Sequence, residues 1–189
     1  MFKQKAVFID RDGTVIEAIH RPDFVKKITA PFYEDELRFF PDIYQALEEL
    51  KNMGFLRIMV TNQPDVANGY MEEEVWQKIQ TRVVEAFPFD GIKMCRHTPN
   101  SGCPNRKPLP GMLLSASDDF GIDLSRSYMI GDTDADTKAG EGAGCGTILI
   151  DRFYNQDVKS DSRVKDLLSA VKTIKFTEKL VQDLKALKH

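Results

Sequence analysis

The chain has 189 residues, of which 42% are hydrophobic and 29% are charged, and its formal net charge is −3. This length suits one domain with a substantial core, and the charge argues against a protein that holds nucleic acid by bulk attraction to phosphates. The apolar runs are too short to cross a membrane, and no basic-then-apolar leader opens the sequence. We therefore expect a cytoplasmic protein with neither a membrane nor a nucleic-acid partner.

Short apolar runs alternate with segments of helical periodicity along most of the chain. The predicted strands are residues 6–9, 56–60, 92–94, 128–130 and 147–150. These runs lack polar and apolar alternation, which is typical of strands buried on both faces of a parallel sheet. The predicted helices are residues 43–53, 75–87, 112–120 and 135–143. This order predicts an α/β fold with a mostly parallel sheet.

The C-terminal part of the chain has a different pattern. Residues 164–171 and 180–187 are amphipathic, with Leu180, Leu184 and Leu187 at helical spacing, and no further strand is predicted there. We expect two helices, within about 162–188, that pack on the edge of the domain or contact a partner. No repeat or linker divides the chain, so residues 1–189 are predicted to form a single domain, and a monomer is expected.

Two carboxylates, Asp10 and Asp12, follow the first predicted strand in the sequence FIDRDGT. Parallel sheets bind ligands beyond the carboxyl ends of their strands. An aspartate there can attack a phosphoryl group and form an aspartyl-phosphate, and a second can protonate the leaving oxygen and then activate water. Two crowded acids also favour a hard divalent cation such as Mg²⁺. The alternative interpretation is an acidic surface turn.

Three weaker signals follow in order. Thr61 and Asn62 end the second predicted strand, where a hydroxyl or amide can hydrogen-bond a phosphoryl oxygen. Lys107 lies in RKPLPG before a helix, where it can neutralise phosphoryl charge. Asp132 and Asp136 lie in YMIGDTDAD after another apolar strand. Each signal alone has a simpler interpretation, namely a polar turn, a solvated lysine and an acidic loop.

The four motifs, in this order, resemble those of the haloacid dehalogenase-like (HAD) superfamily. The resemblance covers Asp10 to Asp136 and implies a Rossmann-like three-layer α/β/α sandwich with its site at the strand ends. It implies that Asp10 is the nucleophile and Asp12 the general acid and base. The phosphate-binding residues would be Thr61, Asn62, Arg106 and Lys107. The Mg²⁺ ligands would be Asp10, the carbonyl of Asp12 and Asp132, with Asp136 as a ligand or an orienting group.

Sequence features also narrow the reaction within this superfamily. Members that act on carbon–halogen bonds lack an acid at the position of Asp12, so its presence favours hydrolysis of a phosphate ester. A phosphomutase of this superfamily usually carries a helical cap, and the segments 14–41 and 62–107 leave no room for one. We therefore expect a capless phosphatase. The basic residues His20, Arg21, Lys26 and Lys27 could face the substrate, but a solvated loop is the favoured interpretation.

A cluster of soft metal ligands precedes Lys107 in the sequence CRHTPNSGCPNRKP. Cys95, His97 and Cys103 have a spacing that suits zinc. The loop resembles that of the HAD branch containing D-glycero-D-manno-heptose 1,7-bisphosphate phosphatase and histidinol-phosphate phosphatase, but Asn105 stands where that branch has a fourth ligand. Three alternatives follow: a weaker Zn²⁺ site with water in fourth place, a site completed by a nearby residue, or a loop without zinc. Cys145 is interpreted as a core residue.

The favoured function is that of a Mg²⁺-dependent phosphatase acting on a small phosphorylated sugar, namely a D-glycero-D-manno-heptose 1,7-bisphosphate 7-phosphatase. TNQPDVANGYMEEE and RKPLPGML are similar to the heptose enzymes, although Pro64 and Asp65 replace an expected Ser-Gly. The alternatives are a histidinol-phosphate phosphatase, a polynucleotide 3′-phosphatase and a non-catalytic binding module. The intact motif residues argue against the binding module.

Overall fold

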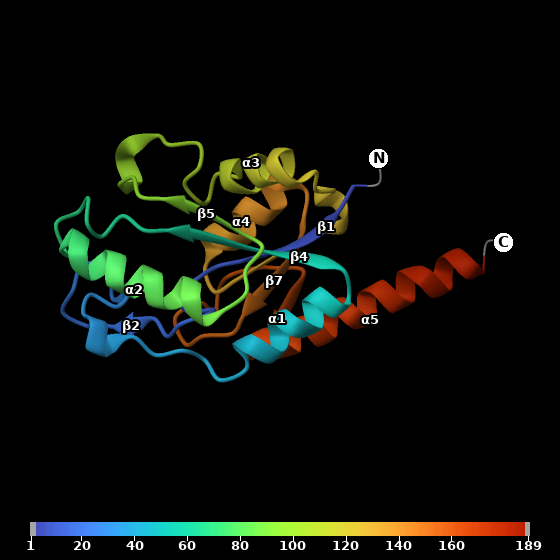
Figure 1. Ribbon diagram of the computed structural model, residues 1–189, viewed down its shortest axis with the longest axis horizontal. Coiled ribbons are helices and arrows are strands. Elements are labelled where there is room, and N and C mark those ends of the chain that lie inside the picture. The colour runs from blue at the N-terminus through green and yellow to red at the C-terminus, as the bar shows by residue number, and fades with distance from the viewer. Residues whose placement is uncertain (1–2, 188–189) are drawn as a thin grey trace.

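The computed structural model describes residues 3–187 and is built on a six-stranded parallel sheet (Figure 1). Its strands are β1 (Lys5–Ile9), β4 (Phe55–Asn62), β5 (Gly91–Cys95), β6 (Tyr128–Gly131), β7 (Gly146–Ile150) and β8 (Ser162–Val164). Their order across the sheet is β5-β4-β1-β6-β7-β8, and neighbouring strands run parallel. β1 and β4 pair in register from Lys5 opposite Phe55 to Ile9 opposite Met59.

Helices cover both faces of the sheet and make three layers (Figure 1). The helices are α1 (Ile43–Asn52), α2 (Glu73–Ala86), α3 (Gly111–Phe120), α4 (Asp134–Ala143) and α5 (Leu167–Ala186). One core joins the sheet to α1, α2 and α5, and the other joins it to α3 and α4. The predicted three-layer α/β/α sandwich is therefore confirmed.

The central strand β1 is apolar from Ala6 to Ile9 because both of its faces are buried. Successive side chains of a strand point to opposite faces, and Val7 and Ile9 belong to one core while Ala6 and Phe8 belong to the other. All four are fully buried. Strong burial on both sides makes the carboxyl end of β1 a rigid base for the residues that follow it.

The segment between Thr14 and Pro41 forms a small hairpin and a short turn of 3₁₀ helix. Strands β2 (Ile19–His20) and β3 (Ile28–Thr29) pair antiparallel, and η1 (Glu34–Glu36) follows them. The hairpin lies at the end of the molecule toward which β4 points (Figure 1). Two further 3₁₀ turns, η2 (Pro99–Ser101) and η3 (Leu124–Arg126), flank α3.

The predictions for the C-terminal part of the chain were wrong in two respects. β8 is a strand, although none was predicted, because it has only three residues, lies at the sheet edge and has no apolar run. A single helix, α5, replaces the two predicted helices. Residues 172–179 contain neither Gly nor Pro, so nothing interrupts the helix between the two amphipathic segments. Within residues 3–187, no helix is long and apolar enough to cross a membrane.

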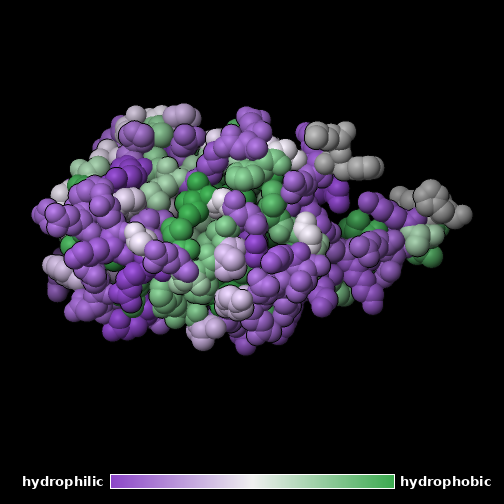
Figure 2. All heavy atoms as spheres, in the orientation of Figure 1, coloured by the Kyte–Doolittle hydropathy of each residue, from purple (hydrophilic) through white to green (hydrophobic). Residues whose placement is uncertain are grey.

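The two halves of α5 have different surroundings. The first half packs on α1, β7 and β8 and buries Leu167, Ala170, Val171 and Ile174. The second half projects away from the sandwich (Figures 1 and 2) and exposes Leu180, Leu184 and Leu187. Of the two halves of this helix, the first therefore supplies the buried apolar contacts that stabilise the fold.

Replacing Ile174 with Ala tests whether the first half of α5 stabilises the fold more than the second half does. Ile174 is fully buried, so we expect the free energy of unfolding to fall by about 2–4 kcal/mol in chemical denaturation. The matched control is Leu184→Ala, at a position 52% exposed, with an expected change within about 0.5 kcal/mol. An equal loss in both variants would mean that the projecting half is buried in solution.

Candidate active site

The strands β1, β4 and β6 bring polar residues together at one edge of the sheet. Asp10 directly follows β1, Asn62 ends β4, and Asp132 directly follows β6. These residues border a cavity of about 250 Å³. The other charged residues that line it are Asp12, Lys26, Asp65, Arg106 and Lys107. Most of the predicted site residues thus lie around one cavity.

The buried ammonium group of Lys107 lies at the centre of this arrangement. Lys107 is 4% exposed, and its Nζ donates hydrogen bonds to Asp10 Oδ1 at 2.6 Å, Asp136 Oδ1 at 2.5 Å and the Val60 carbonyl at 2.8 Å. Asn62 makes two hydrogen bonds to the Lys107 backbone. Its Nδ2 donates to Lys107 O at 2.9 Å, and its Oδ1 accepts from Lys107 N at 3.1 Å. Asn62 therefore positions the lysine.

Three buried carboxylates form a group that fits a divalent cation. Oxygen atoms of Asp10, Asp132 and Asp136 lie within 4.8 Å of one another. Within the described part of the chain, Asp132 Oδ1 is buried without a hydrogen-bond partner, while Asp132 Oδ2 accepts a hydrogen bond from the Tyr154 hydroxyl. A buried carboxylate oxygen needs a donor or a cation. Hard oxygen donors of this kind suit Mg²⁺.

Burial and the neighbouring negative charges shift the pKa values of these groups. Burial raises the pKa of Asp10 to about 7; Lys107 opposes this shift, and Asp136 and Asp12 add to it. Burial also raises the pKa of Asp132 well above its usual range, with Asp10 and Asp136 acting in the same direction. Burial lowers the pKa of Lys107, but Asp10 and Asp136 outweigh this effect and raise it overall. Lys107 therefore stays charged, and one lysine does not neutralise the cluster.

The carboxylate of Asp12 is held at the cavity wall by two side chains. Arg11 is fully buried and donates from Nη2 to Asp12 Oδ1 at 2.9 Å, and its Nη1 donates to Gln80 Oε1 at 2.8 Å. Gln63 Nε2 donates to Asp12 Oδ2 at 2.6 Å. Gly13 then turns the chain with a φ of 81°, and a Cβ there would lie 2.1 Å from Asp132 Oδ2. Only glycine fits this close approach.

Several positioning residues come from a loop that the sequence did not mark as functional. After β7, Asn155 Nδ2 donates to the carbonyl of Asp132 at 2.7 Å, and Arg152 Nη2 donates to the carbonyl of Gly13 at 2.7 Å. Tyr154 contacts the Asp132 carboxylate from the same loop. The only signal was the unusual sequence DRFYNQ after the last predicted strand.

Three predictions about single residues can be compared with the geometry. Thr61 is fully buried and its hydroxyl accepts a hydrogen bond from Gln63 Nε2 at 2.9 Å; it does not line the cavity, so its contact with phosphate stays a prediction. Lys26 lines the cavity, which agrees with the less favoured interpretation that it faces the substrate. Cys145 is buried in the core with α3 and α4, as predicted.

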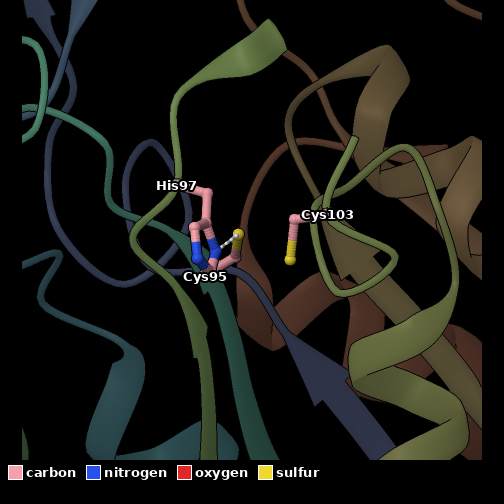
Figure 3. Close-up of side chains that lie close together, drawn as sticks. All are labelled: Cys95, His97 and Cys103. Carbon is pink, nitrogen blue, oxygen red and sulfur yellow. Dashed lines mark hydrogen bonds between the residues drawn. The ribbon is translucent and has the colours of Figure 1, made fainter. Parts of the chain in front are cut away.

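The predicted soft ligands also lie together (Figure 3). Cys95 ends β5, and its Sγ lies 3.6 Å from His97 Nδ1; Cys103 approaches from the loop that leads to α3 (Figure 3), and the three ligand atoms lie within 4.8 Å of one another. Burial raises the pKa of the Cys95 thiol. Asn105 is exposed. Arg106 Nη1 donates to the carbonyl of His97 at 2.8 Å, so the shape of this loop determines where Arg106 meets the cavity.

Comparisons of the sequence with known proteins show the family of this chain. Residues 104–169 match the family of HAD-hydrolase-like proteins. The D-glycero-beta-D-manno-heptose-1,7-bisphosphate 7-phosphatase of Yersinia pestis is 36% identical over 159 residues, 78% of this chain and 80% of that protein. The D-glycero-alpha-D-manno-heptose-1,7-bisphosphate 7-phosphatase of Burkholderia mallei is 34% identical over 182 residues, 89% of this chain and 88% of that protein.

A solved structure extends the agreement to the fold. The D,D-heptose 1,7-bisphosphate phosphatase from B. bronchiseptica, in complex with magnesium and phosphate, matches with a TM-score of 0.75 and 27% identity, over 95% of this chain and 99% of that one. The fold is that of a HAD-like hydrolase. More narrowly, the chain belongs to the family of the D-glycero-D-manno-heptose-1,7-bisphosphate 7-phosphatases. It is a phosphatase.

Replacing Lys107 with Met tests the electrostatic role of the buried lysine. The variant leaves Asp10 and Asp136 as buried carboxylates without their counter-charge, so we expect the free energy of unfolding in urea to fall by about 3–5 kcal/mol. The control is Lys138→Met, which removes an exposed ion pair with Asp134 and should cost less than about 0.5 kcal/mol. Unchanged stability of the Lys107 variant would contradict the central place of this ion pair.

Proposed function

We propose that Asp10 is the nucleophile of a phosphomonoester hydrolase that works through an aspartyl-phosphate. The observation that carries this proposal is the surroundings of Asp10, which borders the cavity, contacts the buried ammonium group of Lys107 and lies beside the unpartnered oxygen of Asp132. A carboxylate in such a site can attack a phosphorus atom, while the neighbouring cation stabilises the charge of the transferring group.

The reaction then takes two steps. An Asp10 carboxylate oxygen forms a bond to phosphorus as the ester P–O bond breaks, and Asp12 gives its proton to the departing alkoxide. Asp12 next takes a proton from water, which attacks the phosphorus of the aspartyl-phosphate, releases inorganic phosphate and restores Asp10. Arg11 and Gln63 support this role because they hold the Asp12 carboxylate at the cavity wall. Lys107 supplies positive charge to the phosphoryl oxygens.

The cation that fits the carboxylate group is Mg²⁺, held by Asp10, Asp132 and the carbonyl of Asp12. When bound, it neutralises charge on the phosphoryl oxygens. Asp136 serves better as an orienting group than as a ligand, because its Oδ1 accepts from Lys107 and its Oδ2 accepts from the backbone N–H of Thr133 at 3.0 Å. A relative of 27% identity binds magnesium and phosphate, which supports this assignment.

The substrate that we propose is D-glycero-D-manno-heptose 1,7-bisphosphate, cleaved at the 7-phosphate. The names of the relatives in Yersinia pestis and Burkholderia mallei support it, and they cover both anomers of this sugar. Arg106 and Lys26 on the cavity wall offer positive charge to a second phosphate. A cytoplasmic location and a monomeric state remain predictions.

We further propose that Cys95, His97 and Cys103 hold a structural Zn²⁺ ion. Their sulfur and nitrogen donors are those that zinc prefers, and the three atoms lie close enough to share one ion. A neutral amide is a weak ligand, so Asn105 leaves the fourth position to water. The ion would fix the loop that positions Arg106.

The function can be tested with a panel of phosphate esters assayed with and without Mg²⁺. We expect kcat/KM for one anomer of the heptose bisphosphate to exceed that for histidinol phosphate or a 3′-phosphorylated oligonucleotide by at least about a hundredfold. Asp10→Asn lacks the attacking carboxylate, so kcat should fall by roughly four orders of magnitude without loss of the folded state. Full activity of that variant would remove the mechanism, and a preference for another ester would remove the substrate.

Zinc can be tested by elemental analysis and chelator competition. Wild-type protein prepared without chelator should retain zinc, and Asn105→Cys, which adds a fourth thiolate, should bind it at least about tenfold more tightly. Asn105→Ser serves as the control and should match the wild type. Less than about a tenth of an equivalent of zinc in the wild type would exclude a tight site.

A further inference from the structure

Asp65 is a buried carboxylate in the cavity wall that no part of the proposed mechanism uses. It is 8% exposed and lines the same cavity as Asp10 and Asp12. Its backbone carbonyl accepts a hydrogen bond from Tyr70 N at 2.9 Å, but its side chain makes no hydrogen bond or ion pair within residues 3–187. The carboxylate group of Asp65 is therefore exposed only toward the cavity.

The position of Asp65 is electrostatically unfavourable in the free protein. Burial raises its pKa, and the charge of Asp12 raises it further, while Lys26, Arg11 and Arg106 only partly offset these effects. A buried carboxylate is stable when donors surround it. None of the nearby cations bonds to it, so its oxygens are free to accept hydrogen bonds from a molecule that enters the cavity and displaces water there.

The neighbours of Asp65 indicate which part of a substrate it would meet. Lys107, Asp10 and Asp132 surround the place of the phosphoryl group, and a further carboxylate there would repel that group. Asp65 follows Gln63 by two residues, and Gln63 bonds to Asp12, which protonates the leaving oxygen in the proposed reaction. The charge of Asp12 also acts on Asp65, so Asp65 lies close to the group that protonates the leaving oxygen.

We propose that Asp65 determines specificity by accepting hydrogen bonds from hydroxyl groups of the leaving alcohol, on the carbon next to the ester oxygen. This inference rests on the proposed function, because it takes Asp10 as the site of ester hydrolysis. The substrate class is phosphate esters of polyhydroxylated alcohols, to which a heptose 7-phosphate belongs. An ester with an anionic group at the adjacent carbon is disfavoured by charge repulsion.

Three small phosphate esters that differ in the group on the carbon next to the ester oxygen test whether Asp65 accepts hydrogen bonds from hydroxyl groups. Glycerol 3-phosphate has a hydroxyl on the adjacent carbon, n-propyl phosphate has none, and phosphoethanolamine has an ammonium group there. We expect wild-type kcat/KM for glycerol 3-phosphate to exceed that for n-propyl phosphate by at least about tenfold, as for a hydrogen bond to a charged group. Asp65→Leu should bring this ratio close to one, and Asp65→Asn, which keeps an acceptor, should give an intermediate value.

Thermal unfolding at neutral pH distinguishes this role from a structural one. Asp65→Asn removes a charge that burial and Asp12 oppose, so its melting temperature should rise, whereas loss of a structural contact would lower it. The control is Asp118→Asn, an exposed position on α3, which should change neither the ratio nor the melting temperature.

Three other results would overturn the inference, and only the last of them would also overturn the proposed function. An unchanged ratio in Asp65→Leu, with turnover retained, would overturn the inference and leave the proposed function standing. A wild-type preference for phosphoethanolamine over glycerol 3-phosphate of more than about tenfold would overturn the assignment to hydroxyl groups. Failure of wild-type protein to hydrolyse these esters and the heptose bisphosphate alike would overturn the proposed function and, with it, this inference.

Discussion

The ammonium group of Lys107 joins parts of the chain that are far apart in sequence. It bonds to Asp10 after β1, to Asp136 on α4 and to the backbone of β4, in a place that solvent barely reaches. Asn62 holds its backbone from the end of β4. Parallel strands end at a common edge, and this buried ion pair brings the polar residues at that edge into one site. It holds the carboxylates of Asp10 and Asp136 next to each other.

The same site carries more negative charge than its lysine neutralises. Asp10, Asp132 and Asp136 lie within 4.8 Å of one another, and the pKa of Asp10 is raised to about 7 chiefly by burial. A site of this kind is unstable in a protein without a cation and is stabilised when a cation binds. Asp132 Oδ1, on one of these carboxylates, is among the buried polar atoms without a hydrogen-bond partner in residues 3–187. This electrostatic cost in the free protein would favour binding of a cation, and the bound cation would in turn attract the phosphoryl group.

The sequence predicted the α/β fold and most of its strands and helices, because local patterns of apolar residues encode them. The apolar runs of β1 and β4 marked strands buried on both faces. Asp10 and Asp132 were singled out because short motifs follow β1 and β6, and Lys107 because its motif precedes α3. Contacts between distant residues were missed. Tyr154 and Asn155 reach Asp132 from a loop without a motif, and the partnership of Arg11 and Gln63 with Asp12 exists only in the folded chain. β8 was missed because its pairing with β7, and not its own composition, makes it a strand.

Proton release on Mg²⁺ binding tests the electrostatic account most directly. With a pKa of about 7, Asp10 is about half protonated at pH 7 without metal, and Asp132 adds to the bound protons because its pKa is also raised. Binding requires deprotonated ligands, so affinity should increase as the pH rises through 7. Calorimetry in buffers of different ionisation enthalpy should show release of at least about half a proton per ion at pH 7. Binding without proton release, at an affinity independent of pH between 6 and 8, would contradict the account.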